Sequence, residues 1–512
     1  MFIGAFDILE LIDDITMTFT SGYFLIFFLV VVLMYYMVSA KDRWVVLLIG
    51  SLLFGAVGGG IQVILYPLVM TTIVYNAAIM IENIDETQQK RRRLFLAMVI
   101  LILSAILVLI KCDVKFDLKF INIVYPIGIS YYIFSMISYL VDVYWGNDKA
   151  EHNLFRLMLY TIYFPKMMQG PIARHKELAA QLAKRSYFSY QNFCFGLQRM
   201  IWGFFKKLVI AERAGIVASR VLGNYEDYGG CILFVGVVLE TVQLYCDFSG
   251  YMDIAIGISQ TFGIALEENF DHPFFSKSAE EFWRRWHITL GAWFKDYVYM
   301  PIAFVVSPKL VKLSTWTKKH VGKQAGKAIT TVIPLTVVWF LTGLWHGTGL
   351  NYIVWGMYWG CIIIFSSLCS EKIRQFTGWL HINTHSVSWK TFQMIRTFLL
   401  FCFGQLITAP GDLKVSYEIV KKFLFDSRIW ELVDGTIYTI GLDRINFQLM
   451  LVCIGLLWIV SIMQEKCRIR ERAANWNFVF RCLFYCMAIW SVMVFGMYGP
   501  EYDANAFLYM NF

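Results

Sequence analysis

The sequence of 512 residues contains little charge, since Asp, Glu, Lys and Arg together make up 16% of it, whereas about 25% is usual in soluble domains. Hydrophobic residues make up 58% of the chain, and the mean hydropathy is +0.57. A soluble protein of this size could not keep so much apolar surface out of water. The composition excludes a disordered chain and a secreted disulfide scaffold, and it leaves a polytopic membrane protein.

Several motifs with a known chemistry are missing. The eleven cysteines include no C-x-x-C pair, so we expect neither a disulfide framework nor a zinc site. The absence of G-x-S-x-G, Walker-type, G-x-G-x-x-G and H-E-x-x-H motifs argues against a serine hydrolase, an ATPase and a zincin. The net charge of +8 arises from short basic clusters between apolar runs, so no nucleic-acid partner is expected.

The first 150 residues predict a series of membrane-spanning helices. Glycines 58–60 predict a turn between the second and third spans, and basic residues follow the first span and the third. Basic residues favour the cytoplasmic side, which places the N-terminus outside. The expected spans of this part are 22–39, 44–57, 61–81, 94–110 and 121–145.

Beyond residue 150 the apolar runs are interrupted by Pro, Gly and charged residues, which predicts re-entrant or broken helices that line a cavity. We expect an all-α polytopic membrane protein with roughly eleven to thirteen transmembrane or re-entrant helices. The simplest organisation is one integral membrane domain, with N-terminal spans in 1–150, a catalytic core in 151–370 and C-terminal spans in 371–512. Two basic stretches, 308–327 and 464–472, are expected to be cytoplasmic loops or a docking surface for an acidic donor or carrier.

Ionisable residues within apolar spans are costly and usually face a cavity. Glu240, Gln243 and Asp247 have the spacing i, i+3 and i+7, which places them on one face of a helix. This stripe is either a hydrogen-bonded seam between helices or the wall of a polar tunnel.

A second segment begins at Ser278, whose spacing to Glu281 is that of a capping box at a helix start. Arg284 and Arg285 in this segment suit either contact with lipid phosphates or a place in the tunnel. His287 follows, and the helical pattern predicts an aromatic residue and a cation one turn before it on the same face. Such a histidine is either structural or part of the chemistry.

His346 lies in a strongly apolar span, after Trp345 and before Gly347. Because desolvation disfavours the imidazolium, its side chain should be neutral at pH 7 and able to accept a proton as a general base. The flanking glycines allow a ligand or another backbone to approach closely. The alternative is a hydrogen-bonded histidine with a purely structural role.

At these residues the chain resembles the membrane-bound O-acyltransferase family, in particular its bacterial alginate O-acetyltransferase subgroup, with the teichoic acid D-alanyl transferases as cousins. The segments that carry the resemblance reach from the first half of the chain to its end: Phe164–Lys166, Gly170–Ile172, Arg174–His175, Gln243–Gly257, Glu268–Phe274, Glu281–Leu290, Leu344–Gly347 and Tyr498–Phe512.

The resemblance implies helices around a central tunnel, an acyl thioester donor such as acetyl-CoA or an acyl carrier, and a hydroxyl acceptor on a cell-envelope polysaccharide. It implies His346 as the central catalytic residue and His287 as a residue that orients or polarises a reactant, with Trp345 beside the tunnel. No metal or bound cofactor is implied. The expected setting is the bacterial cytoplasmic membrane, with membrane lipid and an exported acetylesterase-like protein as partners. The alternatives are D-alanyl transfer to teichoic acid and a lipid or sugar transporter, which would also need intramembrane polar residues.

Overall fold

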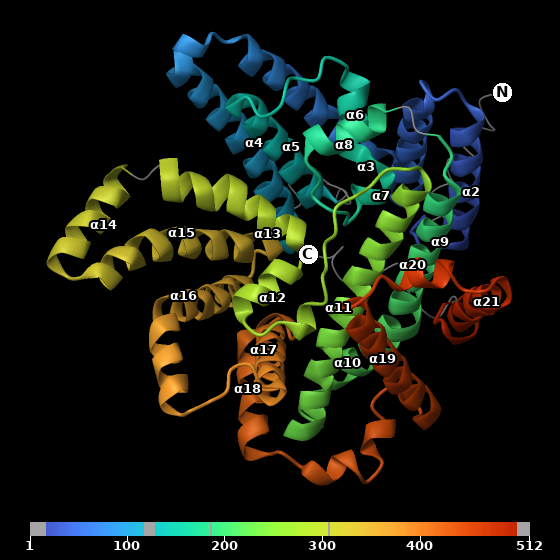
Figure 1. Cartoon of the computed structure of the whole chain (residues 1–512), viewed down its shortest axis with the longest axis vertical. Helices are drawn as coiled ribbons and strands as arrows, with labels where there is room; N and C mark the ends of the chain where they lie inside the picture. Colours follow the sequence, from blue (N-terminus) through green and yellow to red (C-terminus); the bar gives the residue numbers. More distant parts are fainter. Residues whose placement is uncertain (1–16, 117–127, 185–186, 306–307, 499–512) are drawn as a thin grey trace. The chain divides into compact units, whose positions relative to one another are not determined.

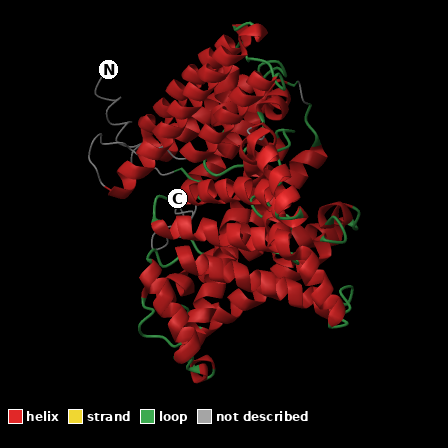
Figure 2. Cartoon of the chain, turned by 90° about the vertical axis from the view of Figure 1, so that its left-hand side faces the viewer, coloured by secondary structure: helices red, strands yellow, loops and turns green. Residues whose placement is uncertain are grey.

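The computed structural model describes residues 17–116, 128–184, 187–305 and 308–498. Over this part of the chain the protein is built of helices joined by turns and loops, with no strand (Figure 2). A single antiparallel bridge within it pairs Phe270 with Trp286. The all-α architecture predicted from the sequence is therefore confirmed.

The helices belong to two compact units. Figure 1 labels the helices and colours them in their order along the chain. Unit 1 is drawn from residues 1–209, 247–268 and 469–512, and unit 2 from residues 210–246 and 269–468. Helix α11 (Gly230–Thr261) and the π-helical segment η2 (Phe205–Ala211) begin in one unit and end in the other.

The remaining helices of unit 1 are α2 (Gly22–Met37), α3 (Arg43–Asn83), α4 (Gln89–Phe116), α5 (Ile129–Trp145), α6 (Leu154–Ile162), α7 (Phe164–Met167), α8 (His175–Ala183), α9 (Tyr190–Phe204), α20 (Ile469–Ala474) and α21 (Phe478–Phe495). Those of unit 2 are α10 (Glu212–Gly223), α12 (Ala279–Arg285), α13 (Ile288–Phe294), α14 (Pro308–His320), α15 (Lys323–His346), α16 (Leu350–Trp379), α17 (Val387–Thr408), α18 (Leu413–Phe425) and α19 (Arg444–Gln464). Short 3-10 and π segments are η1 (Glu86–Gln88), η3 (Pro273–Phe275), η4 (Lys295–Tyr299), η5 (Pro301–Val305), η6 (Ile429–Leu432) and η7 (Thr436–Tyr438).

Nine helical segments in the described residues are long and apolar enough to cross a membrane. They are Arg43–Gly60, Val63–Asn83, Glu86–Cys112, Gly230–Thr261, Ala328–His346, Leu350–Trp379, Val387–Thr408, Arg444–Gln464 and Phe478–Phe495. No residue of the last segment is fully buried inside the protein, so its exposed apolar side chains suit contact with lipid. The chain is a multi-pass membrane protein.

Several shorter helices lie between these spans. Helix α6 has nine residues and is about 14 Å long, against the roughly 30 Å of a hydrocarbon core. Helices α12 and α13 have seven residues each. The interrupted apolar runs beyond residue 150 thus correspond in part to broken helices, as the sequence indicated.

The predicted turn between the second and third spans is present as a sharp kink within α3. Gly59 has φ −161° and ψ 17°, and Gly60 has φ 78° and ψ 167°. The left-handed φ of Gly60 is a conformation that glycine adopts without strain. The first apolar run forms the 16-residue helix α2, which is shorter than the expected span of 22–39.

Unit 1 contains a close crossing of α9 against the second half of α11, made by two pairs of glycines. A Cβ atom at Gly203 would lie 2.6 Å from the Gly250 carbonyl oxygen, and one at Gly257 would lie 2.6 Å from that of Gly196. Small residues let helix backbones approach closely where no hydrophobic force drives helices together in lipid. The crossing therefore fixes which side chains of α9 and η2 meet those of α11.

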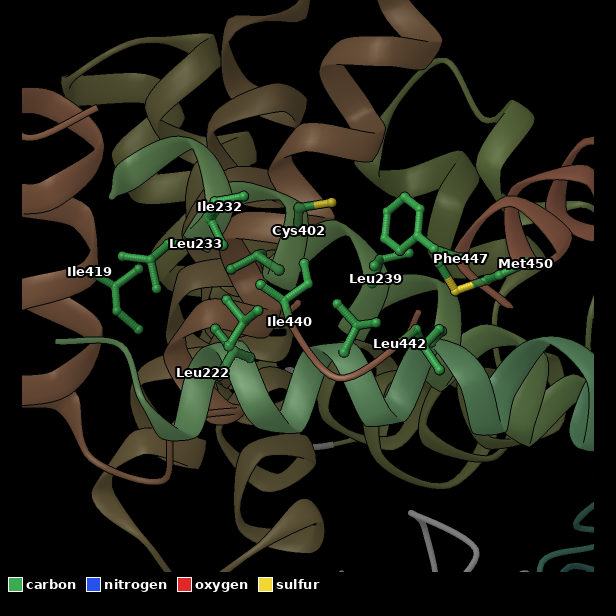
Figure 3. Packing of buried hydrophobic residues seen from close by; sticks show 14 of the residues in the cluster. Leu222, Ile232, Leu233, Leu239, Cys402, Ile419, Ile440, Leu442, Phe447 and Met450 are labelled. Carbon is green, nitrogen blue, oxygen red and sulfur yellow. The ribbon is translucent and has the colours of Figure 1, made fainter. Parts of the chain in front are cut away.

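Unit 2 has a compact apolar core made by α10, the first half of α11, α17, α18, α19 and the loop before α19. Figure 3 shows Leu222, Leu239, Cys402, Ile419 and Met450 converging in this core. All of these side chains are at most 7% exposed. This core holds the part of α11 that carries Glu240 and Gln243.

The lysine-rich stretch 308–327 is largely helical, and α14 is not among the segments able to cross a membrane, so a cytoplasmic connection or a docking surface stays a prediction. Residues 308–320 form α14, and α15 begins at Lys323 and packs against it. Helix α14 presents exposed Lys312, Lys318 and Lys319 together with Trp316, which is 56% exposed. The other basic stretch, 464–472, contains the turn between α19 and α20 and the first residues of α20.

Candidate functional site

His346 is the last residue of α15, and its side chain is buried, with 7% exposure. The helix ends here because Gly347 adopts extended backbone, with φ −178° and ψ 162°. A Cβ atom at Gly347 would collide with the ring of Tyr352 at the start of α16. The glycine after the histidine is therefore required by the tight turn into α16, as the sequence suggested.

Two further glycine contacts fix how α15 and α16 cross. A Cβ atom at Gly343 would lie 2.6 Å from the Tyr352 carbonyl oxygen, and one at Gly356 would lie 2.4 Å from the Trp339 carbonyl oxygen. This approach brings Trp355 of α16 against His346, with ring centroids 4.8 Å apart at 73°. Trp355 was not singled out from the sequence, since its contact depends on the crossing of two helices.

The two histidine segments meet through Trp345. The ring of Trp345 lies 4.8 Å from that of His346 and 5.9 Å from that of His287. Trp345 is 7% exposed and His287 2% exposed, so the three rings form one buried group within unit 2. The structure thus brings together residues 59 positions apart in sequence, which is what a shared site requires.

His287 lies in the break between α12 and α13 and has the left-handed backbone conformation φ 48° and ψ 52°. This conformation is rare for a residue other than glycine and occurs often at functional sites. The side chain of Asn269 holds it in place, because the Asn269 Oδ1 lies 3.2 Å from His287 Nδ1 and also accepts from the Thr289 backbone N–H and hydroxyl. Asn269 belongs to a motif quoted above but was not predicted as a site residue.

The contact with Asn269 sets the tautomer of His287. An amide oxygen that already accepts two hydrogen bonds requires a donor from the imidazole, which places the proton on Nδ1. Nε2 is then the basic nitrogen. Burial lowers the pKa of His287 to about 3, so this side chain is neutral near pH 7.

The expected flanking of His287 by residues one helical turn earlier is wrong, because α12 ends at Arg285 and Trp286 has extended backbone. The bridge between Phe270 and Trp286 accounts for this break in the helix. The helix start is confirmed, since Ser278 Oγ accepts from the Glu281 N–H at 3.1 Å.

The two arginines of α12 have different surroundings. Arg284 is 69% exposed and lies 3.7 Å from Glu280. Arg285 is 22% exposed, and its guanidinium pairs with Glu281 at 3.0 Å and with Glu465 at 2.6 Å. Arg285 therefore joins α12 to the end of α19, and neither arginine has a described contact with His287.

The polar stripe of α11 is present on one continuous helix. Gln243 is half-buried and lies against α10, where a Cβ atom at Gly215 would be 2.5 Å from its Nε2. Glu240 is half-buried too. Asp247 is buried, and its Oδ1 lies 2.5 Å from Lys207 Nζ. The contacts of Gln243 and Asp247 fit a seam between helices, and a tunnel wall at Glu240, Gln243 and Asp247 stays a prediction.

Unit 1 contains a buried ionic cluster that was not predicted from the sequence. Lys206 Nζ lies 2.6 Å from Asp253 Oδ2 and 2.9 Å from Ser249 Oγ, and Arg199 pairs with both Asp253 and Glu268. The signal available was the pair of lysines, 206–207, within an apolar run that faces the carboxylates of α11 across the glycine crossing. In the described residues, no group of three or more His, Cys, Asp or Glu side chains could hold a metal ion.

Residues 147–314 match the family model of the MBOAT, membrane-bound O-acyltransferase, family. This part of the chain, about a third of its length, therefore carries the sequence features of the family. The histidine His287 lies within the matched region, whereas His346 lies beyond it. The resemblance stated from the sequence motifs is confirmed, although its C-terminal segment, 499–512, lies outside the described residues.

Three curated relatives show the range of the family. The probable alginate O-acetylase AlgI of Pseudomonas syringae pv. tomato is 34% identical over 311 residues, which are 61% of this chain and 54% of that protein. The peptidoglycan O-acetyltransferase of Helicobacter pylori is 28% identical, over 60% of this chain and 62% of its own length. The teichoic acid D-alanyltransferase of Bacillus subtilis is 28% identical, over 55% of this chain and 68% of its own length. The chain thus spans about half the length of the alginate O-acetylases that it matches.

Proposed function

We propose that this chain is a membrane-bound O-acyltransferase that transfers an acetyl group from a thioester to hydroxyls of a cell-envelope polysaccharide. Relatives named as alginate and peptidoglycan acetyl-transferring enzymes support the acyl group and the kind of acceptor. The observation that carries the proposal is the buried ring contact of His287, Trp345 and His346. A transporter has no need of two histidines held together in this way.

In the proposed reaction, neutral His346 accepts the proton of the acceptor hydroxyl as its oxygen attacks the thioester carbonyl carbon. The carbonyl electron pair moves onto its oxygen and forms a tetrahedral intermediate. When the C=O bond re-forms, the C–S bond breaks and the thiolate takes the proton from the His346 imidazolium. The products are the ester and the free thiol, and no metal takes part in any of these steps.

His287 orients a reactant in this scheme. Its Nδ1–H is held by Asn269, so Nε2 is the ring nitrogen that can accept from a hydroxyl or an amide N–H. Because burial keeps this imidazole neutral, it adds no charge that would have to be desolvated. Glu240, Gln243, Asp247, Arg284, Arg285 and Trp345 remain proposed tunnel residues.

The proposal includes a direction across the membrane. Acyl thioesters are made in the cytoplasm, whereas envelope polysaccharide lies outside, so the acyl group must pass through the protein. The exposed lysines of α14 would raise the local concentration of an anionic donor if this helix faces the cytoplasm. We place the N-terminus outside and the protein in a bacterial cytoplasmic membrane, with an exported acetylesterase-like protein as the partner that receives or passes on the acyl group.

D-alanyl transfer is the second candidate, because the D-alanyltransferase relative is matched over 68% of its length. The two candidates share the chemistry and differ in the donor. Acetyl transfer uses acetyl-CoA or an acetyl carrier, whereas D-alanyl transfer requires a carrier protein loaded with D-alanine.

The test uses the full chain in sealed proteoliposomes that contain isolated envelope glycan, with labelled acetyl-CoA or labelled D-alanyl carrier added outside. We expect acetyl label on the glycan, and we expect His346→Ala to reduce transfer by about 10²–10⁴-fold, as for other general bases. Near-normal turnover of correctly folded His346→Ala would refute the assignment of the base. Transfer of D-alanine alone would select the second candidate, and transport of glycan without ester formation would select a transporter.

A further inference from the structure

Trp355 contacts His346 and carries a buried polar atom that the proposed mechanism does not use. Its side chain is 5% exposed, and its Nε1 is buried without a hydrogen-bond acceptor among the described residues. Buried indole N–H groups usually find an acceptor, because an unpaired buried donor loses its hydrogen bond to water. An orphaned donor beside a candidate general base indicates that the acceptor is a reactant.

Other tryptophans of the same aromatic group help to define the position of this donor. Trp283 packs perpendicular to Trp355 at 5.6 Å, and Trp359 packs against Trp283 at 5.2 Å. The Nε1 of Trp359 is 3.1 Å from the position of a Cβ atom at Gly404, so it faces α17. Of Trp283, Trp355 and Trp359, Trp355 is the one whose ring packs against His346, as the ring of Trp345 also does.

The reach of the indole fits the reaction. A hydroxyl that gives its proton to His346 lies about 2.6–3.2 Å from the imidazole nitrogen. The carbonyl carbon under attack lies about 3–3.5 Å further on in a near-attack arrangement. The carbonyl oxygen is thus held within a few ångströms of His346. The indole ring of Trp355, centred 4.8 Å from the imidazole, lies at a similar distance from that histidine.

We propose that Trp355 is the oxyanion donor of this enzyme, with its indole N–H bound to the carbonyl oxygen of the thioester. As the acceptor oxygen bonds to the carbonyl carbon, the carbonyl electron pair moves onto the oxygen, and the N–H stabilises that negative charge. The charge returns to form C=O when the thiolate leaves. The ligand class is a thioester carbonyl, and the inference rests on the proposed function of His346.

A neutral donor suits this place better than a cation. The rings of Trp345 and Trp355 pack against the imidazole of His346. In such low-dielectric surroundings a fixed dipole aimed at a developing charge stabilises it strongly and needs no reorganisation. A tryptophan gives this dipole while its ring also excludes water from the thioester.

The test compares Trp355→Phe with Trp339→Phe. Both replace an indole by a smaller ring in the same aromatic group, but the Nε1 of Trp339 is not an orphaned buried donor. We expect Trp355→Phe to lower kcat about 100-fold, as loss of one oxyanion donor does, with the KM for acetyl-CoA nearly unchanged. Trp339→Phe should keep turnover close to that of the parent protein. An unchanged kcat, or a raised KM with normal kcat, would overturn the proposal.

If Trp355→Phe does not fold, a variant with β-(3-benzothienyl)alanine at position 355 replaces the N–H by sulfur and keeps the ring shape. It should show the same loss of kcat, and normal kcat would again overturn the proposal. The proposed function and the oxyanion donor can be refuted separately. An active His346→Ala variant would refute the proposed function, whereas an inactive His346→Ala with a fully active Trp355→Phe would refute only the oxyanion donor.

Discussion

The ion pair between Lys207 and Asp247 gives a direct test of whether Asp247 of α11 lies in a packed seam. The two side chains are 3% and 2% exposed, and Nζ lies 2.5 Å from Oδ1. Lys207→Met removes the cation and leaves the Asp247 carboxylate buried without its ion-pair partner. Breaking a buried pair in this way costs about 3–5 kcal/mol, because the remaining charge is no longer compensated. We therefore expect the free energy of unfolding to fall by about that amount.

The assay is reversible unfolding in mixed lipid–detergent micelles, applied to both single variants and to Lys207→Met with Asp247→Leu. The double variant should lose much less stability than Lys207→Met alone, since apolar replacement of both partners leaves no buried charge. Lys312→Met is the matched control, because Lys312 is exposed on α14 and its loss should change stability by at most about 0.5 kcal/mol. A cost below about 1 kcal/mol for Lys207→Met would show that water reaches Asp247, as in a tunnel wall.

Three further predictions concern the candidate site. Gly343→Leu should lower both folded yield and turnover, because a Cβ atom there would lie 2.6 Å from the Tyr352 carbonyl oxygen, whereas Gly378→Leu, placed in open space, should not. As the pH is lowered from about 6.5 to about 3, His287 takes up a proton in the unfolded chain but stays neutral in the folded chain. The free energy of unfolding should therefore fall by about 1.4 kcal/mol for each pH unit of acidification in this range. This contribution should be absent in His287→Gln. Asn269→Leu should lower turnover by releasing His287 Nδ1, while Asn269→Asp, which keeps an acceptor oxygen, should retain more activity; equal losses would contradict the positioning role.

The sequence predicted those features that depend on local rules. The kink at Gly59 and Gly60 follows from a run of glycines between apolar segments, and the start of α12 follows from Ser278 and Glu281. His346 could be identified because an ionisable residue in an apolar span is costly and needs a reason. Each of these inferences used only residues within a few positions of one another.

The features that were missed depend on contacts between distant segments. The break at Trp286 depends on a bridge to Phe270, and without that bridge the residues from Ala279 to His287 read as a continuing helix. The role of Asn269 depends on a hydrogen bond across 18 residues.

The glycine contacts suggest how a membrane protein specifies a polar site without a hydrophobic driving force between helices. In unit 1 the crossing of α9 and α11 is followed directly by the pairing of Lys206 and Lys207 with Asp253 and Asp247. In unit 2 the crossing of α15 and α16 sets Trp355 against His346. A Cβ atom at any of these crossings would push two backbones apart and separate the polar groups beside them. Since lipid solvates apolar helix faces as well as another helix does, the close backbone contact and the buried polar pairs together determine the register of the helices. The same glycines that make the fold compact therefore also determine which histidine, tryptophan and carboxylate meet.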